Sequence, residues 1–332
     1  TTKASARSAY QVLNLDDIGV TDPKTGYGTY SGSVKSSITG GTFSSDVSKY
    51  VADGYEIVPQ GDQWVVGTLN DLAVAEVDGQ KYASLSEAVA AVPNGGTVTL
   101  IHDSVLLAPI QITDQTFTLD MNGKTMSLGA TATEGGTIIF SGNSNVTITG
   151  DGIVDFNDSY LEGNSTGRMF EVDGTATLTI ENGTFEGGLV CVLADQNATV
   201  RIMDGNYSTI AKYDGKYWVL NKQDNTGTTF LVYGGTFKNY DPANSDTEDP
   251  TDNFCAPGYV SVKDGNSYTV MSMKEAAAAK IGDEYYLTLA EAVEAAKDND
   301  TIELLKTTQG GGVQVIGDGR HITIDLNGHT YT

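Results

Sequence analysis

The chain is poor in basic residues, and it contains no long apolar run. Its 332 residues include 19 lysines and arginines against 43 acidic residues, which gives a formal net charge of −24. This charge excludes ordinary nucleic-acid binding, which needs a basic surface, and argues against docking on anionic lipid. No segment has the length of a transmembrane helix, and no signal-peptide pattern is present. We therefore expect neither nucleic-acid binding nor membrane insertion in this segment.

Cysteine and proline are also scarce. The two cysteines, Cys191 and Cys255, could form a disulfide, but a simpler interpretation makes Cys191 a small apolar strand residue and places Cys255 in a loop. In contrast, 39 glycines accompany abundant threonine, asparagine and aspartate. This composition is typical of many short strands joined by tight turns.

One long stretch of the sequence occurs twice at a fixed separation. Ala75 and Ala279 begin the two copies (279 − 75 = 204), and Tyr55 and Tyr259, which open two predicted hairpins, lie equally far apart (259 − 55 = 204). A repeat of this length predicts a tandem array. Residues 1–72 would be the end of one unit, residues 73–273 a complete unit, and residues 274–332 the start of a third. Neither end resembles a natural terminus, so we expect a fragment of a longer protein.

Each copy contains the pattern of an amphipathic helix. Leu85, Val89 and Val92 recur at helical spacing, and Ser84 and Glu87 have the spacing of a capping box. The second copy repeats this arrangement from Thr288 to Ala296. The sequence therefore predicts one short helix near the start of each unit.

Short segments with alternating apolar residues fill the complete unit. Leu178 and Ile180 alternate with threonines, and the ends of such segments follow each other at intervals of 22 to 32 residues (202 − 180 = 22; 180 − 148 = 32). One strand–turn–strand per interval predicts a solenoid of strands, a parallel β-helix. In it, Leu178 should lie over Ile148 and under Val200. The helix and the hairpin beginning at Tyr259 should close the two ends of each unit.

This pattern resembles the right-handed parallel β-helix modules, pectate-lyase-like in shape, of large surface proteins of Gram-positive gut bacteria. Two motifs carry the resemblance: Ala-Lys-Ile-Gly-Asp with Leu-Ala-Glu-Ala-Val-Glu-Ala-Ala in residues 279–305, and Gly-Gly-Thr-Phe-Ser with Val-Ser-Lys-Tyr-Val-Ala-Asp-Gly-Tyr in residues 40–55. With the strand pattern they cover nearly the whole chain. The resemblance implies an all-β, right-handed solenoid on the bacterial cell surface. It also implies adhesin-like binding of a host glycoprotein, such as an immunoglobulin, or of a glycan.

Other proteins of this shape cleave polysaccharides, so an enzyme is the alternative class. The polygalacturonase-like motif set is absent, and the histidines at 102, 321 and 329 stand singly. We therefore predict no catalytic residues and no cofactor. Calcium is a weaker alternative, at Asp151, Asp155 and Asp158 or in the acidic insertion 241–253.

Aromatic residues are the best candidates for ligand binding. Four lie in or beside one predicted loop and a fifth lies in another: Tyr207, Tyr213, Tyr217, Trp218 and Tyr160. Aromatic side chains on a rigid frame suit a sugar face or a protein partner. Alternatively, several of them pack their loops onto the strands. A third function class is a self-assembling filament, in which residues 274–332 of one copy stack on residues 1–72 of another.

Overall fold

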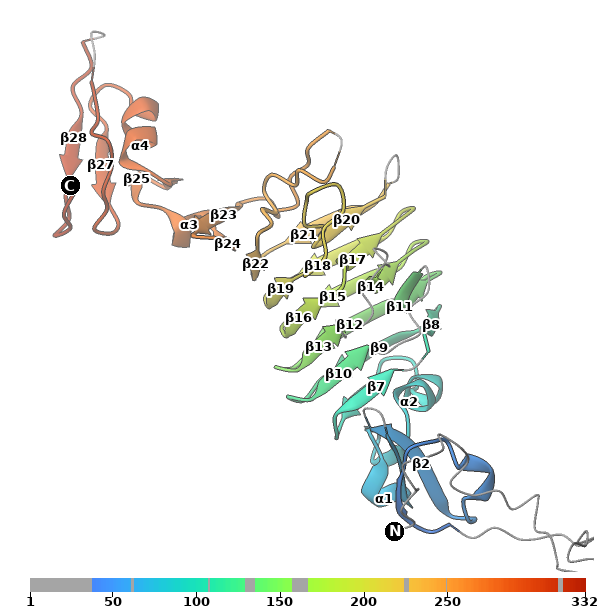
Figure 1. Cartoon of the computed structure of the whole chain (residues 1–332). Helices are drawn as coiled ribbons and strands as arrows, with labels where there is room; N and C mark the ends of the chain where they lie inside the picture. Colours follow the sequence, from blue (N-terminus) through green and yellow to red (C-terminus); the bar gives the residue numbers. More distant parts are fainter. Residues whose placement is uncertain are drawn as a thin grey trace, which may run out of the picture.

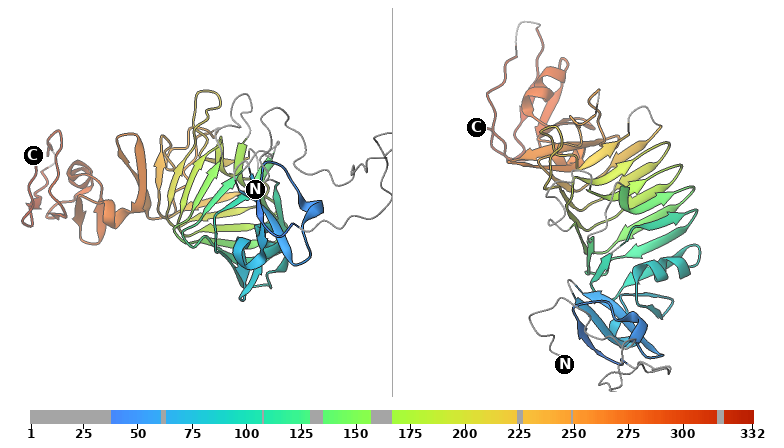
Figure 2. Two further views of the ribbon diagram at one scale, coloured as in Figure 1. Left: turned by 60° about the horizontal axis from the view of Figure 1, so that its bottom comes forward. Right: turned by 45° about the vertical axis from the view of Figure 1, so that its right-hand side comes forward.

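The computed structural model describes residues 38–60, 63–106, 108–128, 135–156, 167–223, 227–248, 250–315 and 319–332. The fold is predominantly β, and its largest sheets are built mainly of parallel strands, which agrees with the predicted all-β class. The molecule is elongated (Figure 1). The strands of its middle part lie in a row, and the segments near the two ends of the chain lie at opposite ends of that row (Figure 2).

Three sheets form the middle part, and the chain runs through them in turn. From β6 to β19, each strand pairs in parallel with the strand three places later in the sequence, for example β12 with β15 and β15 with β18. The first sheet contains β6 (Gly96–Leu100), β9 (Thr116–Asp120), β12 (Asn145–Thr149), β15 (Thr177–Ile180), β18 (Thr199–Ile202) and β21 (Thr229–Val232). The second contains β7 (Ser104–Leu106), β10 (Thr125–Leu128), β13 (Ile153–Phe156), β16 (Thr184–Gly187), β19 (Asn206–Ser208) and β22 (Thr236–Lys238). The third contains β8 (Ile110–Thr113), β11 (Gly135–Ser141), β14 (Gly167–Val172), β17 (Val190–Ala194) and β20 (Leu220–Lys222).

The core lies where the alternating apolar residues of these strands meet. Leu178 and Ile180 of β15 are buried, whereas the threonines between and before them are partly exposed. Leu178 pairs with Val146 on one side and with Val200 on the other. The predicted neighbour Ile148 pairs instead with Ile180. The expected pairing of β12 with β15 was therefore wrong by two residues. The two strands begin together, with Asn145 opposite Thr177, so Leu178 lies opposite Val146.

A short helix, α2 (Leu85–Ala91), packs against one end of this core. It buries Leu85, Ala88 and Val89, and the hydroxyl of Ser84 accepts a hydrogen bond from the Glu87 amide (3.2 Å). At the other end, β23 (Tyr259–Asp264) and β24 (Ser267–Ser272) form an antiparallel hairpin. Strand β24 also pairs with β22, so the hairpin continues the second sheet.

The same order of elements occurs near both ends of the described chain. The first set is β2 (Tyr55–Gln60), β3 (Gln63–Thr68), α1 (Leu69–Leu72), β4 (Ala75–Val77), β5 (Gln80–Tyr82), α2 and β6. The second is β23, β24, α3 (Met273–Ala276), β25 (Ala279–Ile281), β26 (Glu284–Tyr286), α4 (Leu289–Ala295) and β27 (Thr301–Leu304). From the hairpin to the longer helix, each element of the second set starts 204 residues after its counterpart, as for the helices (289 − 85 = 204).

Short elements complete the two ends. Strand β1 (Gly41–Phe43) pairs with β3, and a single 3-10 turn covers Ser48–Tyr50. Strand β28 (Thr323–Asp325) pairs in parallel with β27. Buried apolar residues form one large cluster that reaches from Val74 to Val270 and smaller clusters within each end. In the described ranges, no helix combines the length and the apolar character needed to cross a bilayer.

Candidate functional site

The predicted binding residues fall into three environments. Tyr213, Tyr217 and Trp218 lie between β19 and β20, in the loop predicted to carry a binding surface. Tyr207 lies within β19. Tyr160 falls outside the described residues.

Tyr207 is a core residue, in contrast to the surface role predicted for it. Its side chain is 1% exposed, and its ring stacks between those of Phe185 (5.0 Å between centroids) and Phe237 (4.8 Å). Its hydroxyl donates to the Asp204 carbonyl oxygen (2.9 Å), and burial raises the pKa of this hydroxyl well above its usual value. The sequence contained the signal, because Tyr207 follows Asp-Gly-Asn just as Phe185 follows Asn-Gly-Thr.

The loop between β19 and β20 contains a tight hairpin turn. Tyr213 and Lys216 exchange both backbone hydrogen bonds (3.1 Å each). Between them, Asp214 and Gly215 both have positive φ angles (50° and 75°), as in a type I′ turn. Such a turn holds its flanking residues in one geometry. Tyr213, which is 56% exposed, is therefore presented on a fixed support. The sequence prediction missed this turn, although the Asp-Gly pair signals it.

Trp218 anchors the hairpin to the third sheet. Its indole packs with Ala211 against a small cluster formed by Leu189, Val190 and Leu193 at β17. The indole N–H donates to the Tyr213 carbonyl oxygen (2.9 Å), and the two rings meet edge to face, with centroids 5.7 Å apart. The alternative interpretation, in which the aromatic residues pack the loop onto the strands, therefore describes Trp218. Of Tyr213, Tyr217 and Trp218, only Tyr213 is mostly exposed to solvent.

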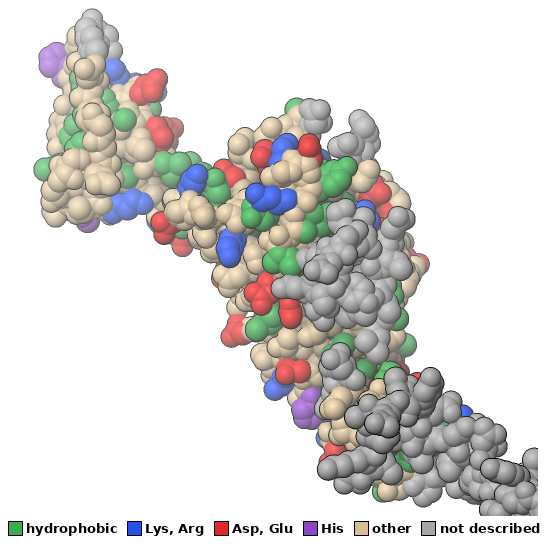
Figure 3. All heavy atoms as spheres, in the orientation of Figure 1, with side chains coloured by type: hydrophobic (Ala, Val, Ile, Leu, Met, Phe, Trp, Pro, Cys, Tyr) green, Lys and Arg blue, Asp and Glu red, His purple; other side chains and the backbone are tan. Residues whose placement is uncertain are grey.

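Two lysines accompany these rings in a chain of strongly acidic character. The Lys212 ammonium lies 4.5 Å from the centre of the Tyr217 ring, within the range of a cation–π contact. The Lys216 ammonium donates to the backbone carbonyl oxygen of Asp246, which ties the hairpin to the acidic insertion. Figure 3 shows basic, acidic and hydrophobic side chains interspersed near β20 and β21. We call Ile210, Lys212, Tyr213, Tyr217 and Trp218 the hairpin surface.

The acidic insertion 241–253 is folded onto β20. Glu248 is 7% exposed, and its carboxylate accepts a hydrogen bond from the Lys222 amide (3.1 Å). Asp252 forms an ion pair with the Lys222 ammonium. Ser245 is fully buried and accepts a hydrogen bond from the Tyr240 hydroxyl (2.9 Å). The insertion is therefore a second support behind the hairpin surface.

The described residues contain no group of three or more histidine, cysteine or acidic side chains placed to hold a metal ion. Asp151 of the proposed calcium cluster accepts a hydrogen bond from the Asn182 amide instead (2.6 Å). Asp158 of that cluster and Asp249 of the insertion lie outside the described residues.

Both cysteines are free thiols. Cys191 is buried in the core and Cys255 is half-buried. Burial raises the pKa of each thiol to about 12. At neutral pH they are protonated and therefore poor nucleophiles and metal ligands.

Comparison with protein-family models, curated proteins and solved structures finds no match. Function must therefore be inferred from the fold and from the surfaces that it carries. The hairpin surface is the candidate with the clearest construction: a rigid turn, an anchoring indole and one exposed ring.

Proposed function

We propose that the chain is a non-catalytic segment of a bacterial cell-surface repeat protein and acts as a rigid stalk. Its middle part would be a right-handed parallel β-helix, with the helix α2 and the hairpin β23–β24 covering the two ends of the core. The observation that carries this proposal is the second set of elements, which begins 204 residues after the first. Boundaries near residues 72 and 273 would then separate successive units of one array.

The stalk would carry a lateral binding surface for a host glycoprotein or a glycan, and an immunoglobulin is one candidate partner. The hairpin surface supports this second part. Tyr213 stands exposed on a two-residue turn, so its binding would cost little conformational entropy. Lys212 and Lys216 place two ammonium groups on the same loop, together with the carboxylate-bearing Asp214 of the turn. Aromatic rings with adjacent donors suit sugar rings and the acidic groups of glycoproteins.

A binding experiment with matched variants tests this surface. The chain would be presented to a glycan array and to host secretions, alongside Tyr213→Ala and, as a control, Ile324→Ala. Ile324 is also exposed but lies on β28, far from the hairpin (Figure 1). A partner that is lost with Tyr213→Ala and kept with Ile324→Ala supports the proposal. Partners bound equally by both variants would refute the assignment to the hairpin surface.

The rival functions have simple tests. Incubation with acidic polysaccharides, with and without Ca²⁺, would reveal a lyase or hydrolase, and turnover would overturn the non-catalytic assignment. Concentration-dependent light scattering would reveal head-to-tail self-association. A filament of that kind would replace the stalk-and-surface proposal only if it formed without any partner being bound.

A further inference from the structure

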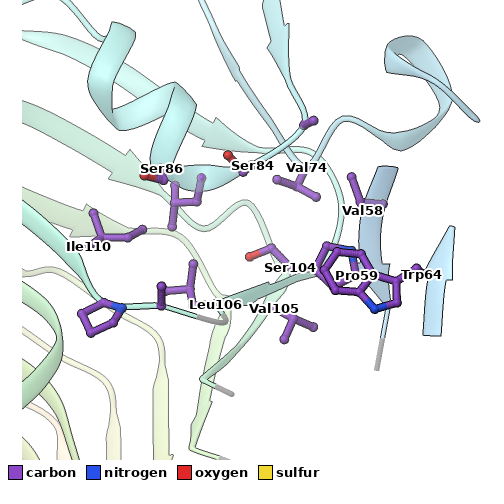
Figure 4. A pocket seen from close by; sticks show the side chains of 14 residues that line it. Val58, Pro59, Trp64, Val74, Ser84, Ser86, Ser104, Val105, Leu106 and Ile110 are labelled. Atoms are coloured by element: carbon purple, nitrogen blue, oxygen red, sulfur yellow. The ribbon is translucent and has the colours of Figure 1, made fainter. Parts of the chain in front are cut away.

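A cavity of about 220 Å³ lies where the hairpin β2–β3 meets the following part of the chain. Val58, Pro59 and Trp64 of the hairpin line one side (Figure 4). The other side is formed by the residue before β4, by the start of α2 and the residues before it, by β7, and by residues between β7 and the start of β8. Among them are Val74, Ala83, Ser86, Ser104, Leu106 and Ile110. We call this space the joint cavity. It is separate from the hairpin surface.

Among the described residues, none that lines the joint cavity carries an ionisable side chain. Most of the lining residues are aliphatic or aromatic, and the polar ones are serines. An adjoining hollow shares Val58, Pro59, Val74, Ser104 and Val105 with it and is also lined by Asp71, His102 and Asp103. Burying a charged group among apolar residues without a partner is strongly unfavourable. The part of the joint cavity beside Trp64 and Leu106 therefore favours a neutral group, and the ionisable side chains lie in the adjoining hollow.

Among the lining serines, Ser104 has a buried hydroxyl without a hydrogen-bond partner in the described part of the chain. Its side chain is 6% exposed. Figure 4 shows this hydroxyl directed into the space between Leu106, Val74 and Ser86. By contrast, the Ser84 hydroxyl already accepts a hydrogen bond from the Glu87 amide. A buried hydroxyl without a partner is costly. A ligand that offers one hydrogen-bonding group would remove that cost.

The size of the joint cavity narrows the ligand further. A cavity of about 150 Å³ with an apolar lining accommodates benzene, so a cavity of about 220 Å³ has room for one aromatic ring with a substituent or for two fused rings. A sugar fits the lining poorly, because its several hydroxyls would each need a partner. Trp64 and Pro59 offer flat faces against which a ring can pack.

We propose that the joint cavity binds a small neutral aromatic molecule that carries a single hydrogen-bonding group, such as a phenol or an indole. Its ring packs against Trp64 and Pro59, and its hydroxyl or N–H meets the Ser104 hydroxyl. Because the ligand contacts the hairpin and the following sheets together, its binding also stiffens the joint between them.

The second set of elements provides a comparison within the same chain. At the positions 204 residues later, Lys263 replaces Pro59 and Leu287 replaces Ala83. Leucine adds three carbon atoms to the alanine side chain, and the Lys263 ammonium lies 5.4 Å from the centre of the Tyr268 ring. The residues at these two positions therefore differ in size and charge between the two sets, and Ala83→Leu introduces a side chain that the fold accepts at the equivalent position.

Calorimetric titration with phenol and with toluene tests the proposal on the whole chain. The original chain should bind one phenol, and Ala83→Leu should abolish binding while circular dichroism shows an unchanged fold. Ser104→Ala should weaken phenol binding by about two- to tenfold, as expected for one hydrogen bond, and leave toluene binding unchanged. Toluene lacks the hydrogen-bonding group, so it reports the cavity without Ser104.

Three outcomes with phenol and toluene would overturn the proposal. They are no phenol binding by the folded chain, phenol binding that survives Ala83→Leu, or equal losses of phenol and toluene in Ser104→Ala. If Ala83→Leu fails to fold, the comparison of phenol with toluene in Ser104→Ala decides alone. Binding of glucose with greater affinity than phenol would show that the ligand class is wrong.

Discussion

Replacement of Tyr207 by alanine should destabilise the middle of the molecule strongly. The ring lies almost parallel to those of Phe185 and Phe237, at interplanar angles of 11° and 10°. Truncation of a buried aromatic residue to alanine typically costs about 3–5 kcal/mol, because transfer energy is lost and a cavity remains. Tyr207 is among the largest fully buried side chains of the described residues, so we expect a cost of about 4 kcal/mol.

Tyr207→Phe separates the ring from its hydroxyl. It keeps both stacked contacts and loses only the hydrogen bond to the Asp204 carbonyl oxygen (2.9 Å). One such hydrogen bond contributes about 1 kcal/mol net. The difference of about 3 kcal/mol between the two variants is then the contribution of the ring and the space it fills.

The assay should report local stability, because the buried residues form several separate clusters and a single unfolding transition is not expected. Native-state hydrogen exchange of the amides in β16, β19 and β22 provides that measure. Tyr213→Ala is the matched control, because its ring is exposed, and it should change the local free energy by less than about 0.5 kcal/mol. The assignment of Tyr207 to the core would be refuted if Tyr207→Ala and Tyr213→Ala lost equal amounts of local stability. A loss of local stability below about 1 kcal/mol in Tyr207→Ala would also refute it.

Three further perturbations follow from the structure. Cys191 and Cys255 should react with a thiol reagent at pH 8 only after denaturation, and fast labelling of the native chain would contradict this. Because the pKa of both thiols is raised in the folded state, the free energy of unfolding should fall as pH rises from about 9 toward 12. Asn122→Ala should lower local stability by about 1–2 kcal/mol in hydrogen exchange of the β6 and β9 amides, because Asn122 has a φ of 47° and its side-chain amide donates to the Leu100 carbonyl oxygen (2.9 Å). Asn122→Gly, which tolerates this φ, should cost less, and equal losses in the two variants would contradict this. Glu248→Ala removes the acceptor of the Lys222 amide and should lower the local stability of the 241–253 insertion by about 1–3 kcal/mol. The insertion should then be cleaved faster by a protease, and cleavage at the rate of the original chain would contradict this.

Periodicity in the sequence predicted the strands of the first sheet because these strands have one buried face. The alternation at β15 and its neighbours is regular, so the apolar residues mark the core directly. The pairing of Leu178 with Val146 was harder to predict, because every apolar residue of β12 is an equally plausible neighbour. Tyr207 was misplaced for a different reason: tyrosine is as common at binding surfaces as in cores, and only its position after the Asp-Gly turn distinguishes the two.

The joint cavity and the hairpin surface depend on contacts between distant segments. Trp64 and Ser104 lie 40 residues apart (104 − 64 = 40) and meet only through the packing of one part of the chain on the next. Local patterns carry no information on such a meeting. The Asp214-Gly215 pair did signal the turn that presents Tyr213, but the anchoring of that turn by Trp218 required the position of β17.

The corner asparagines show which positions the fold constrains and which it leaves free. Asn122 and Asn327 both have a φ of 47°, and their side-chain amides donate to the carbonyl oxygens of Leu100 (2.9 Å) and Leu304 (3.3 Å). A left-handed corner whose side chain reaches back to the preceding strand admits few residue types. The backbone places no such constraint on Ser104, which is not among the positive-φ residues. Differences between the two copies at positions of this kind, including Ala83 and Leu287, are therefore where one frame can carry different binding sites.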